Sequence, residues 1–408
     1  MSKIIIIGLD GADWSIINYL LKKDRLPTFK KLKKDGAYGT LKSVLPISSA
    51  PAWTSFLTGK NPGKHGIFDF LKFNRQTNRI EVVSSNDRKS SCVWNFLKNK
   101  KSIIINVPLT FPPDKINGIM ISGLPNPENT FGYCYPKEIY SELMKEFNGD
   151  IKIQPQIFYH KNAKKDFLED QYMCWRNNEK IFWYLKNKKE WDLLICVFHV
   201  IDEFSHELWK YIDKNHPGFE KNKIGENIFR IYEKADRFLL RLLGDLDENT
   251  TLFVVSDHGF GPVYKTFYLN NWLMDKEWLK LKNTLSTKIR KSLHNSGFNV
   301  YNVLNLFRKI GLNPLSRAYR ETFTQDKSLL AFFSQKLFLS AGDIDWESSK
   351  AYSMGEFGQI YIKKENVKDY GKFLLNLKRE LKKLKMMKLV KKSLTTFLQN
   401  MKYTKVIF

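Results

Sequence analysis

Cysteine is scarce in this chain of 408 residues, and its four cysteines form no Cys-x-x-Cys pair. Their scattered positions argue against a disulfide framework and a thiolate zinc site, and they suit a reducing compartment. No apolar run reaches membrane-spanning length, and the four isoleucines near the N-terminus are too few for a signal-peptide core. We therefore expect a cytoplasmic protein without a transmembrane segment. The cysteines are Cys92, Cys134, Cys174 and Cys196.

Acidic residues are also few, since 42 Asp and Glu face 67 Lys and Arg, which gives a net charge of +25. The excess is strongest over residues 371–408, where Glu380 is the single acid. Such a balance attracts anionic substrates, phospholipid surfaces or nucleic acid. The plainer interpretation is a lysine-rich composition with solvated charged faces. The chain carries no specific nucleic-acid-binding motif, and its oligomeric state stays open.

Apolar runs alternate with helical patterns along most of the chain. Runs rich in β-branched residues, each short and bounded by turn residues, predict strands that are buried on both faces. The alternation predicts an α/β fold with a doubly wound, mostly parallel sheet flanked by helices. The expected strands are 4–9, 39–45, 102–107, 193–198 and 251–256. The expected helices are 13–22, 27–34, 52–57, 203–212 and 224–243.

The composition changes after about residue 274, and the change predicts three parts. Residues 1–274 are expected to form the core. The basic segment 275–345 has helical periodicity and is expected to form an inserted helical cap. Residues 346–408 are expected to return to the core through a strand near 359–362 and a helix over 367–384. The last residues contain no acid, which predicts a truncated or atypical C-terminus.

Acids and histidines follow three of the expected strands directly: Asp10 after the first, Asp202 and His206 after the strand ending at 198, and Asp257 and His258 after the strand ending at 256. The carboxyl ends of parallel strands meet at one edge of a sheet. Each group has a plainer interpretation alone, as a turn, a helix cap or a helix surface pair. Their convergence favours a two-metal site, and mixed carboxylate and imidazole ligands suit Zn²⁺ or Mn²⁺ better than Ca²⁺.

Ser49 lies in a loop of small residues that opens the helix expected over 52–57. The N-terminus of a helix is a natural seat for a phosphate, and a serine there could attack it if a metal activated the hydroxyl. The common alternative for a serine at this place is a helix N-cap. The sequence leaves both roles of Ser49 open.

Together these segments resemble the type I phosphodiesterase/nucleotide pyrophosphatase branch of the alkaline phosphatase superfamily. The resemblance implies a nucleophile at Ser49 that forms a covalent phosphoseryl intermediate, and two divalent metal ions, Zn²⁺ or Mn²⁺. It implies that Asp10, Ser49, Asp257 and His258 bind one ion, and that Asp202, His206 and a later histidine bind the other. The matching segments are 9–12, 49–55, 57–59, 62–67, 202–206 and 256–260.

Three positions depart from that family pattern. Ser49 stands where most relatives carry threonine. Ala52 stands where nucleotide-hydrolysing members carry asparagine, so the sequence leaves nucleotide specificity open. The third departure is the late histidine ligand, because His294, in the expected cap, is the single histidine after His258. His294 is the one substitute that this sequence offers for the missing ligand. His199, at a strand end near Asp202, could support the site.

The sequence therefore predicts a metal-dependent phosphoester hydrolase, either a phosphodiesterase or a phosphatase. Its expected substrate is an anionic phosphoester, a small molecule or a lipid headgroup. A sulfatase is the nearest rival, because residues 49–51 match the start of the sulfatase maturation signature, but Trp53 occupies the arginine position. A cofactor-independent phosphoglycerate mutase and a catalytically impaired relative that binds anions are the remaining alternatives.

Overall fold

The computed structural model describes residues 3–384, apart from 75, 78, 126–130, 150, 156, 158, 160–163, 265, 300–301, 304–337 and 356. The chain forms two compact units, the first made of residues 1–70 and 82–266 and the second of 71–81 and 267–408. Much of the expected cap and the C-terminal residues 385–408 lie outside the described residues. The division at 274 and 345 and the atypical C-terminus therefore stay predictions.

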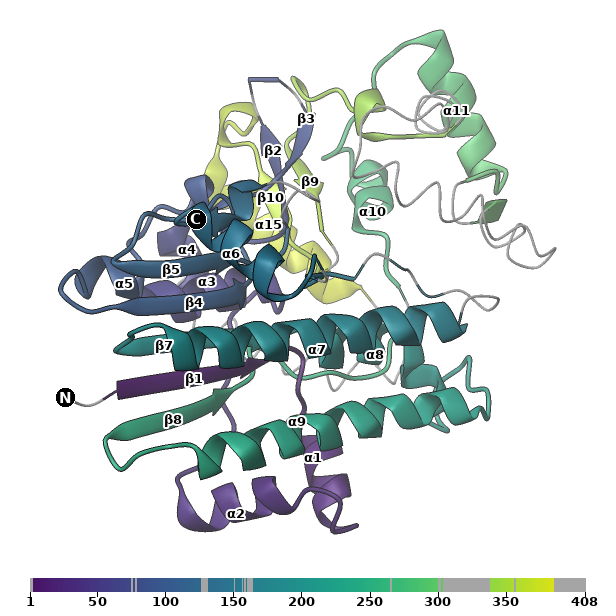
Figure 1. Ribbon diagram of the computed structural model, residues 1–408. Coiled ribbons are helices and arrows are strands. Elements are labelled where there is room, and N and C mark those ends of the chain that lie inside the picture. The colour runs from purple at the N-terminus through teal and green to yellow at the C-terminus, as the bar shows by residue number, and fades with distance from the viewer. Residues whose placement is uncertain are drawn as a thin grey trace. The chain divides into compact units, whose positions relative to one another are not determined.

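A six-stranded sheet forms the centre of the first unit (Figure 1). Its strand order is β6-β5-β4-β7-β1-β8, and all neighbours are parallel except β6, which pairs antiparallel with β5. The predicted α/β fold with a mostly parallel sheet is confirmed. The strands are β1 (Lys3–Leu9), β4 (Ser102–Val107), β5 (Gly118–Ser122), β6 (Cys134–Tyr135), β7 (Leu193–Phe198) and β8 (Thr250–Val255).

The central strands β4 and β7 are buried on both faces, which explains why they are apolar almost throughout. Side chains alternate between two cores: Ile5 and Ile7 face one, and Ile104 and Val197 the other. The first core is completed by α7 (Lys164–Lys188), α8 (Val200–Leu208) and α9 (Glu226–Gly244), and α7 and α9 run along the strands in Figure 1. The second core contains side chains of α3 (Ser49–Thr58) and α5 (Val93–Phe96).

Two helices follow β1 and are anchored at their first turns. Asp13 caps the first of them by accepting a hydrogen bond from the backbone N–H of Ser15 at 2.7 Å. Asp236 of α9 is buried and accepts hydrogen bonds from the backbone N–H groups of Thr28 and Phe29, at the start of the second. The remaining helices of the first unit are α1 (Trp14–Leu21), α2 (Pro27–Asp35), α4 (Pro62–His65) and α6 (Glu138–Glu146).

Several expected boundaries were wrong, and one expected strand does not form. Residues 39–45 contain no strand and are mostly exposed, with Leu41 71% accessible; among the residues that the structure describes, no strand pairs with them. The helix expected from residue 52 begins at Ser49. The helix expected from residue 203 begins at Val200, so Asp202 lies in its first turn. These shifts place two candidate site residues at helix N-termini.

The second unit has a separate aromatic core. Trp272, Trp278 and Phe373 belong to it, and Phe73 stacks on Trp346 with ring centroids 4.0 Å apart. The strand predicted near 359–362 and the helix predicted over 367–384 are both present. The elements are β2 (Leu71–Asn74), β3 (Arg79–Val82), α10 (Leu269–Asp275), α11 (Leu285–Asn295), β9 (Ala351–Ser353), β10 (Ile360–Ile362) and α15 (Tyr370–Lys383).

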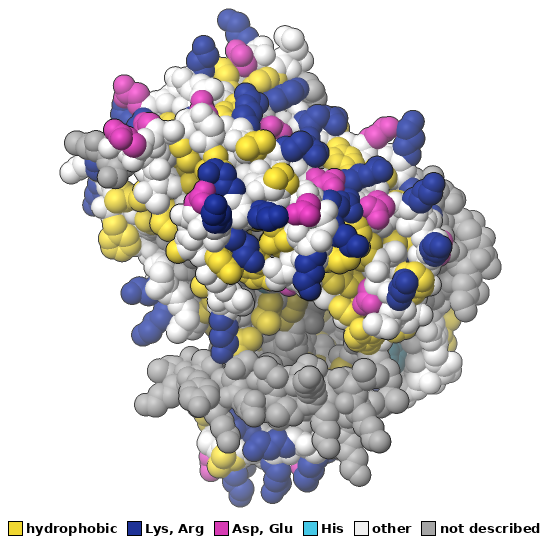
Figure 2. Space-filling view, turned by 90° about the horizontal axis from the view of Figure 1, so that it is seen from below, with side chains coloured by type: hydrophobic (Ala, Val, Ile, Leu, Met, Phe, Trp, Pro, Cys, Tyr) yellow, Lys and Arg dark blue, Asp and Glu magenta, His cyan; other side chains and the backbone are white. Residues whose placement is uncertain are grey.

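The positive charge is dispersed on the face drawn in Figure 2. There, Lys and Arg side chains alternate with Asp, Glu and hydrophobic side chains instead of gathering into one patch. This distribution is typical of solvated charged faces. Across the described part of the chain, no helix combines the length and the apolarity needed to cross a membrane.

Candidate metal centre

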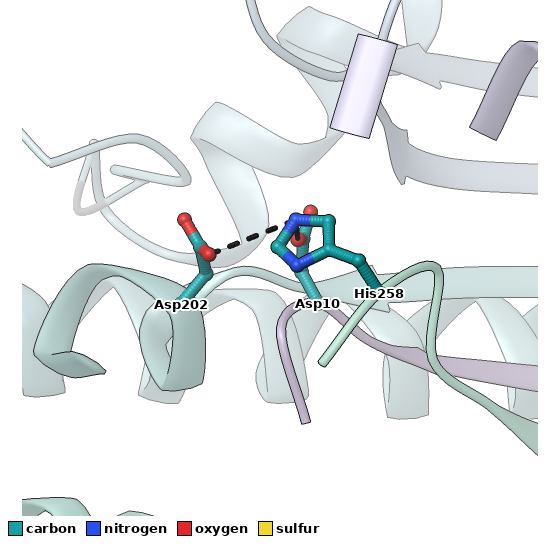
Figure 3. A group of neighbouring side chains, drawn as sticks. All are labelled: Asp10, Asp202 and His258. Atoms are coloured by element: carbon teal, nitrogen blue, oxygen red, sulfur yellow. Dashed lines mark ion pairs between the residues drawn. The ribbon is translucent and has the colours of Figure 1, made fainter. Parts of the chain in front are cut away.

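Three strand ends bring Asp10, Asp202 and His258 together (Figure 3). Asp10 follows β1, Asp202 lies in the first turn of α8 after β7, and His258 follows β8. One ligand atom from each residue lies within 4.8 Å of the other two. His258 Nε2 is 3.6 Å from Asp10 Oδ1 and 3.8 Å from Asp202 Oδ1. This spacing lets the three side chains share one cation.

Asp257 also lies beside His258 and the turn that follows Asp10. Its Oδ1 accepts a hydrogen bond from the backbone N–H of Gly11 at 3.2 Å, and its Oδ2 lies 3.4 Å from His258 Nε2. Asp257 Oδ2 and Asp202 Oδ1 are both buried and find no hydrogen-bond donor among the described residues. Buried carboxylate oxygens without donors are costly. These two oxygens therefore fit the role of cation ligands.

Gly11 is required by the turn that follows Asp10. Its φ is +67°, in the left-handed region that favours glycine. A Cβ atom on Gly11 would lie only 2.8 Å from Asp202 Oδ1. Gly11 therefore lets the segment after β1 approach Asp202, after β7, closely.

Ser49 is the first residue of α3, and its hydroxyl points at the carboxylate of Asp10 and the imidazole of His258. The Oγ atom donates to Asp10 Oδ1 at 3.1 Å and lies 3.1 Å from His258 Nε2. The N-cap position belongs to Ser48. The Ser49 hydroxyl therefore contacts the site and does not occupy the N-cap position, while its role as a nucleophile stays a prediction.

The carboxyls of Asp10 and Asp257 differ in their electrostatic surroundings. Burial alone would raise the pKa of Asp10, but the hydrogen bond and charge of His199, with smaller contributions from His258 and Trp53, lower it to about 2. Burial, followed by the charge of Asp10, raises the pKa of Asp257 well above its usual range. A divalent cation beside Asp257 would supply the positive charge that its ionised form needs.

His206 lies at the edge of the group. Its Nε2 is 3.3 Å from Asp202 Oδ2, and its side chain is 54% exposed. Burial would lower its pKa, but the hydrogen bond and charge of Asp202 raise it to about 9. Within the described residues, no third ligand joins Asp202 and His206 in a second group of three. His294 lies on α11 of the second unit, so the second metal set stays a prediction.

Trp53 and His199 also contact the site, and both bond to Asp10. The sequence suggested a supporting role for His199 beside Asp202, whereas its Nδ1 lies 2.9 Å from Asp10 Oδ2. The sequence assigns no contact with the site to Trp53. Trp53 Nε1 donates to Asp10 Oδ2 at 3.0 Å. The spacing of four residues between Ser49 and Trp53 was the available signal.

A sequence model of the type I phosphodiesterase / nucleotide pyrophosphatase family matches residues 4–329. No curated protein matches the chain.

Three similar solved structures illustrate the range of matches. Phosphonoacetate hydrolase from Sinorhizobium meliloti 1021 has 15% identity and a TM-score of 0.46, over 69% of this chain and 64% of that one. Murine ectonucleotide pyrophosphatase / phosphodiesterase 5 has 18% identity and a TM-score of 0.43, over 70% and 64%. The alkaline phosphatase PafA has 15% identity and a TM-score of 0.44, over 75% of each chain. The chain thus spans less than two thirds of the first two proteins.

Proposed function

The chain belongs to the type I phosphodiesterase / nucleotide pyrophosphatase family, and from this premise we propose that it is a metal-dependent phosphoester hydrolase with Ser49 as its nucleophile. The contact of Ser49 Oγ with both Asp10 Oδ1 and His258 Nε2, each at 3.1 Å, carries the proposal. A serine hydroxyl becomes a competent nucleophile only when a base or a metal activates it.

The proposed ligand sets are those that the family resemblance implies. Asp10, Ser49, Asp257 and His258 would bind one divalent ion, and Asp202 and His206 would contribute to the second. The donor-free oxygens of Asp257 and Asp202 support this assignment. Zn²⁺ or Mn²⁺ fits the mixed carboxylate and imidazole donors. When bound, such ions would lower the pKa of the serine hydroxyl and offset negative charge on the phosphoryl group.

In the proposed reaction, Ser49 Oγ forms a bond to phosphorus while the bond from phosphorus to the leaving alcohol oxygen breaks. Asp10 and His258 would be occupied as ligands, so the Ser49 hydroxyl proton passes to solvent, and the leaving alcohol oxygen takes a proton from solvent. A water molecule then forms a bond to phosphorus while the bond from phosphorus to Ser49 Oγ breaks; the water gives up a proton to solvent, and Ser49 Oγ takes one back. The first turn of α3 contains Ser49, and the backbone N–H groups of a first helical turn favour a phosphate.

The proposed substrate is an anionic phosphoester, either a small molecule or a lipid headgroup, in a cytoplasmic setting. The net charge of +25 supports an anionic substrate. Comparing bis(p-nitrophenyl) phosphate with p-nitrophenyl phosphate would decide between diester and monoester preference.

The test is hydrolysis of these two substrates by the full chain with Zn²⁺ or Mn²⁺. Ser49→Ala should lower kcat/KM by roughly a thousandfold or more, because it removes the nucleophile. Ser49→Thr keeps a hydroxyl and should retain part of the activity. A folded wild-type chain without turnover at any metal loading would contradict the proposed activity. Turnover unaffected by Ser49→Ala would contradict the proposed nucleophile.

A further inference from the structure

The two carboxylate oxygens of Asp10 have different partners. Oδ1 faces the site, where it accepts from Ser49 Oγ. Oδ2 faces the protein interior, where it accepts from Trp53 Nε1 at 3.0 Å and lies 2.9 Å from His199 Nδ1. Asp10, Trp53 and His199 are all buried. The carboxylate is therefore held in one orientation by partners on both sides.

Trp53 and Ser49 lie four residues apart on α3, so their side chains project from the same face of the helix. One turn of α3 thus contacts both oxygens of Asp10. The indole also packs directly against β1. A Cβ atom on Gly8 would lie 2.5 Å from Trp53 Cη2. Gly8, two residues before Asp10, therefore leaves the room that the indole needs to reach the carboxylate.

His199 connects three neighbouring strands of the sheet. It follows β7, which lies between β4 and β1. Its Nδ1 faces Asp10 after β1, and its Nε2 lies 2.8 Å from the backbone oxygen of Asn106 in β4. Because an oxygen atom faces each ring nitrogen, the imidazole is fixed in its plane from both sides.

We propose that Trp53 and His199 are positioning residues that occupy Asp10 Oδ2, so that Oδ1 alone is presented to Ser49 and to the metal. The inference rests on the proposed function for the presence of a metal at Asp10. Without these donors the Asp10 carboxylate can rotate. Binding of the metal ion must then fix an orientation that Trp53 and His199 otherwise provide. Removing a group that orients a metal ligand weakens metal affinity by roughly 10–100-fold.

The experiment measures Zn²⁺ affinity of the full chain by competition with a chromogenic chelator. Trp53→Phe and His199→Phe remove the donors and keep an aromatic ring, and both should bind Zn²⁺ roughly 10–100-fold more weakly than the wild type. Trp94→Phe is the matched control. Trp94 is also buried, and its Nε1 donates to Asp114 Oδ2 at 2.8 Å, away from the site. Trp94→Phe should change the Zn²⁺ affinity by less than about twofold, since no candidate metal ligand loses a hydrogen-bond partner.

A double-variant comparison separates positioning from a general structural effect. Asp10→Asn should weaken Zn²⁺ binding, and adding Trp53→Phe should weaken it no further if Trp53 acts through Asp10. Additive losses would overturn the proposal. If Trp53→Phe does not fold, His199→Gln, which keeps a side-chain N–H donor, should fall between the wild type and His199→Phe.

Zn²⁺ affinities within twofold of the wild type in both phenylalanine variants would also overturn the positioning role. The failure of the proposed function gives a different result. A wild-type chain that binds Zn²⁺ but hydrolyses neither phosphoester contradicts the activity, while the affinity comparison still decides the roles of Trp53 and His199. A wild-type chain that binds neither Zn²⁺ nor Mn²⁺ overturns both.

Discussion

Replacing Gly8 with alanine adds one methyl group between β1 and α3. The new Cβ atom would lie 2.5 Å from Trp53 Cη2 and 2.8 Å from Val197 Cγ2. Carbon atoms in contact are normally about 3.5–4.0 Å apart, so the indole must move by about 1 Å. A movement of that size would break the hydrogen bond from Trp53 Nε1 to Asp10 Oδ2, which is 3.0 Å long.

The expected cost combines two effects. Overpacking in a core costs about 1–3 kcal/mol, and loss of a hydrogen bond to a charged group costs about 1.5–3 kcal/mol. We expect Gly8→Ala to lower the free energy of unfolding by about 3 kcal/mol, measured by urea unfolding without added metal. Trp53→Phe removes Cη2, so the cost of Gly8→Ala should be smaller in the double variant than in the wild-type background.

Gly244→Ala is the control for this measurement. Gly244 ends α9, and a Cβ atom there would have no neighbour within 4 Å. The free energy of unfolding of the Gly244→Ala variant should differ from the wild-type value by less than about 0.5 kcal/mol, or rise slightly, because alanine favours a helix. Equal urea midpoints for Gly8→Ala and the wild type would refute the reasoning, since the indole would then have room that the structure does not show.

Two further predictions concern stability. Burial lowers the pKa of His65 to about 4, from 6.5, so between those values the unfolded chain binds a proton that the folded chain does not. The free energy of unfolding should therefore fall as the pH drops from about 6.5 to about 4, by roughly 2–3 kcal/mol from this group. Urea unfolding should show a weaker pH dependence in His65→Gln, and an identical dependence would exclude His65 as the cause. Asp236→Ala removes the acceptor for the N–H groups of Thr28 and Phe29 and should cost about 2–3 kcal/mol, whereas Asp236→Asn should cost less. An unchanged urea midpoint in Asp236→Ala would contradict this account of how α2 is anchored.

Strands β1, β4 and β7 of the sheet were predictable because burial on both faces requires nearly continuous apolar runs, whereas β5 and β6 were not predicted. Residues 4–9, 102–107 and 193–198 all have this pattern, and all form strands close to the expected bounds. Residues 39–45 have a similar local composition but pair with no strand. Strand formation depends on a hydrogen-bonding neighbour, which a local pattern cannot report.

The grouping of Asp10, Asp202 and His258 was predictable from their places after three strands. The contacts of Asp10 with Trp53 and His199 were less predictable. Trp53 and His199 reach Asp10 through the packing of α3 against β1 and the order of β4, β7 and β1 in the sheet. Such contacts between distant segments have no signature in a single sequence.

The central claim is that Ser49 forms a covalent bond to the phosphorus of the substrate. The most direct measurement is mass spectrometry of peptides from the full chain, acid-quenched during turnover of bis(p-nitrophenyl) phosphate with Zn²⁺ or Mn²⁺. The account predicts a nitrophenyl phosphoryl group on the peptide that contains Ser49. The same adduct on another residue, or a stoichiometric burst of nitrophenolate with no adduct at all, would contradict it.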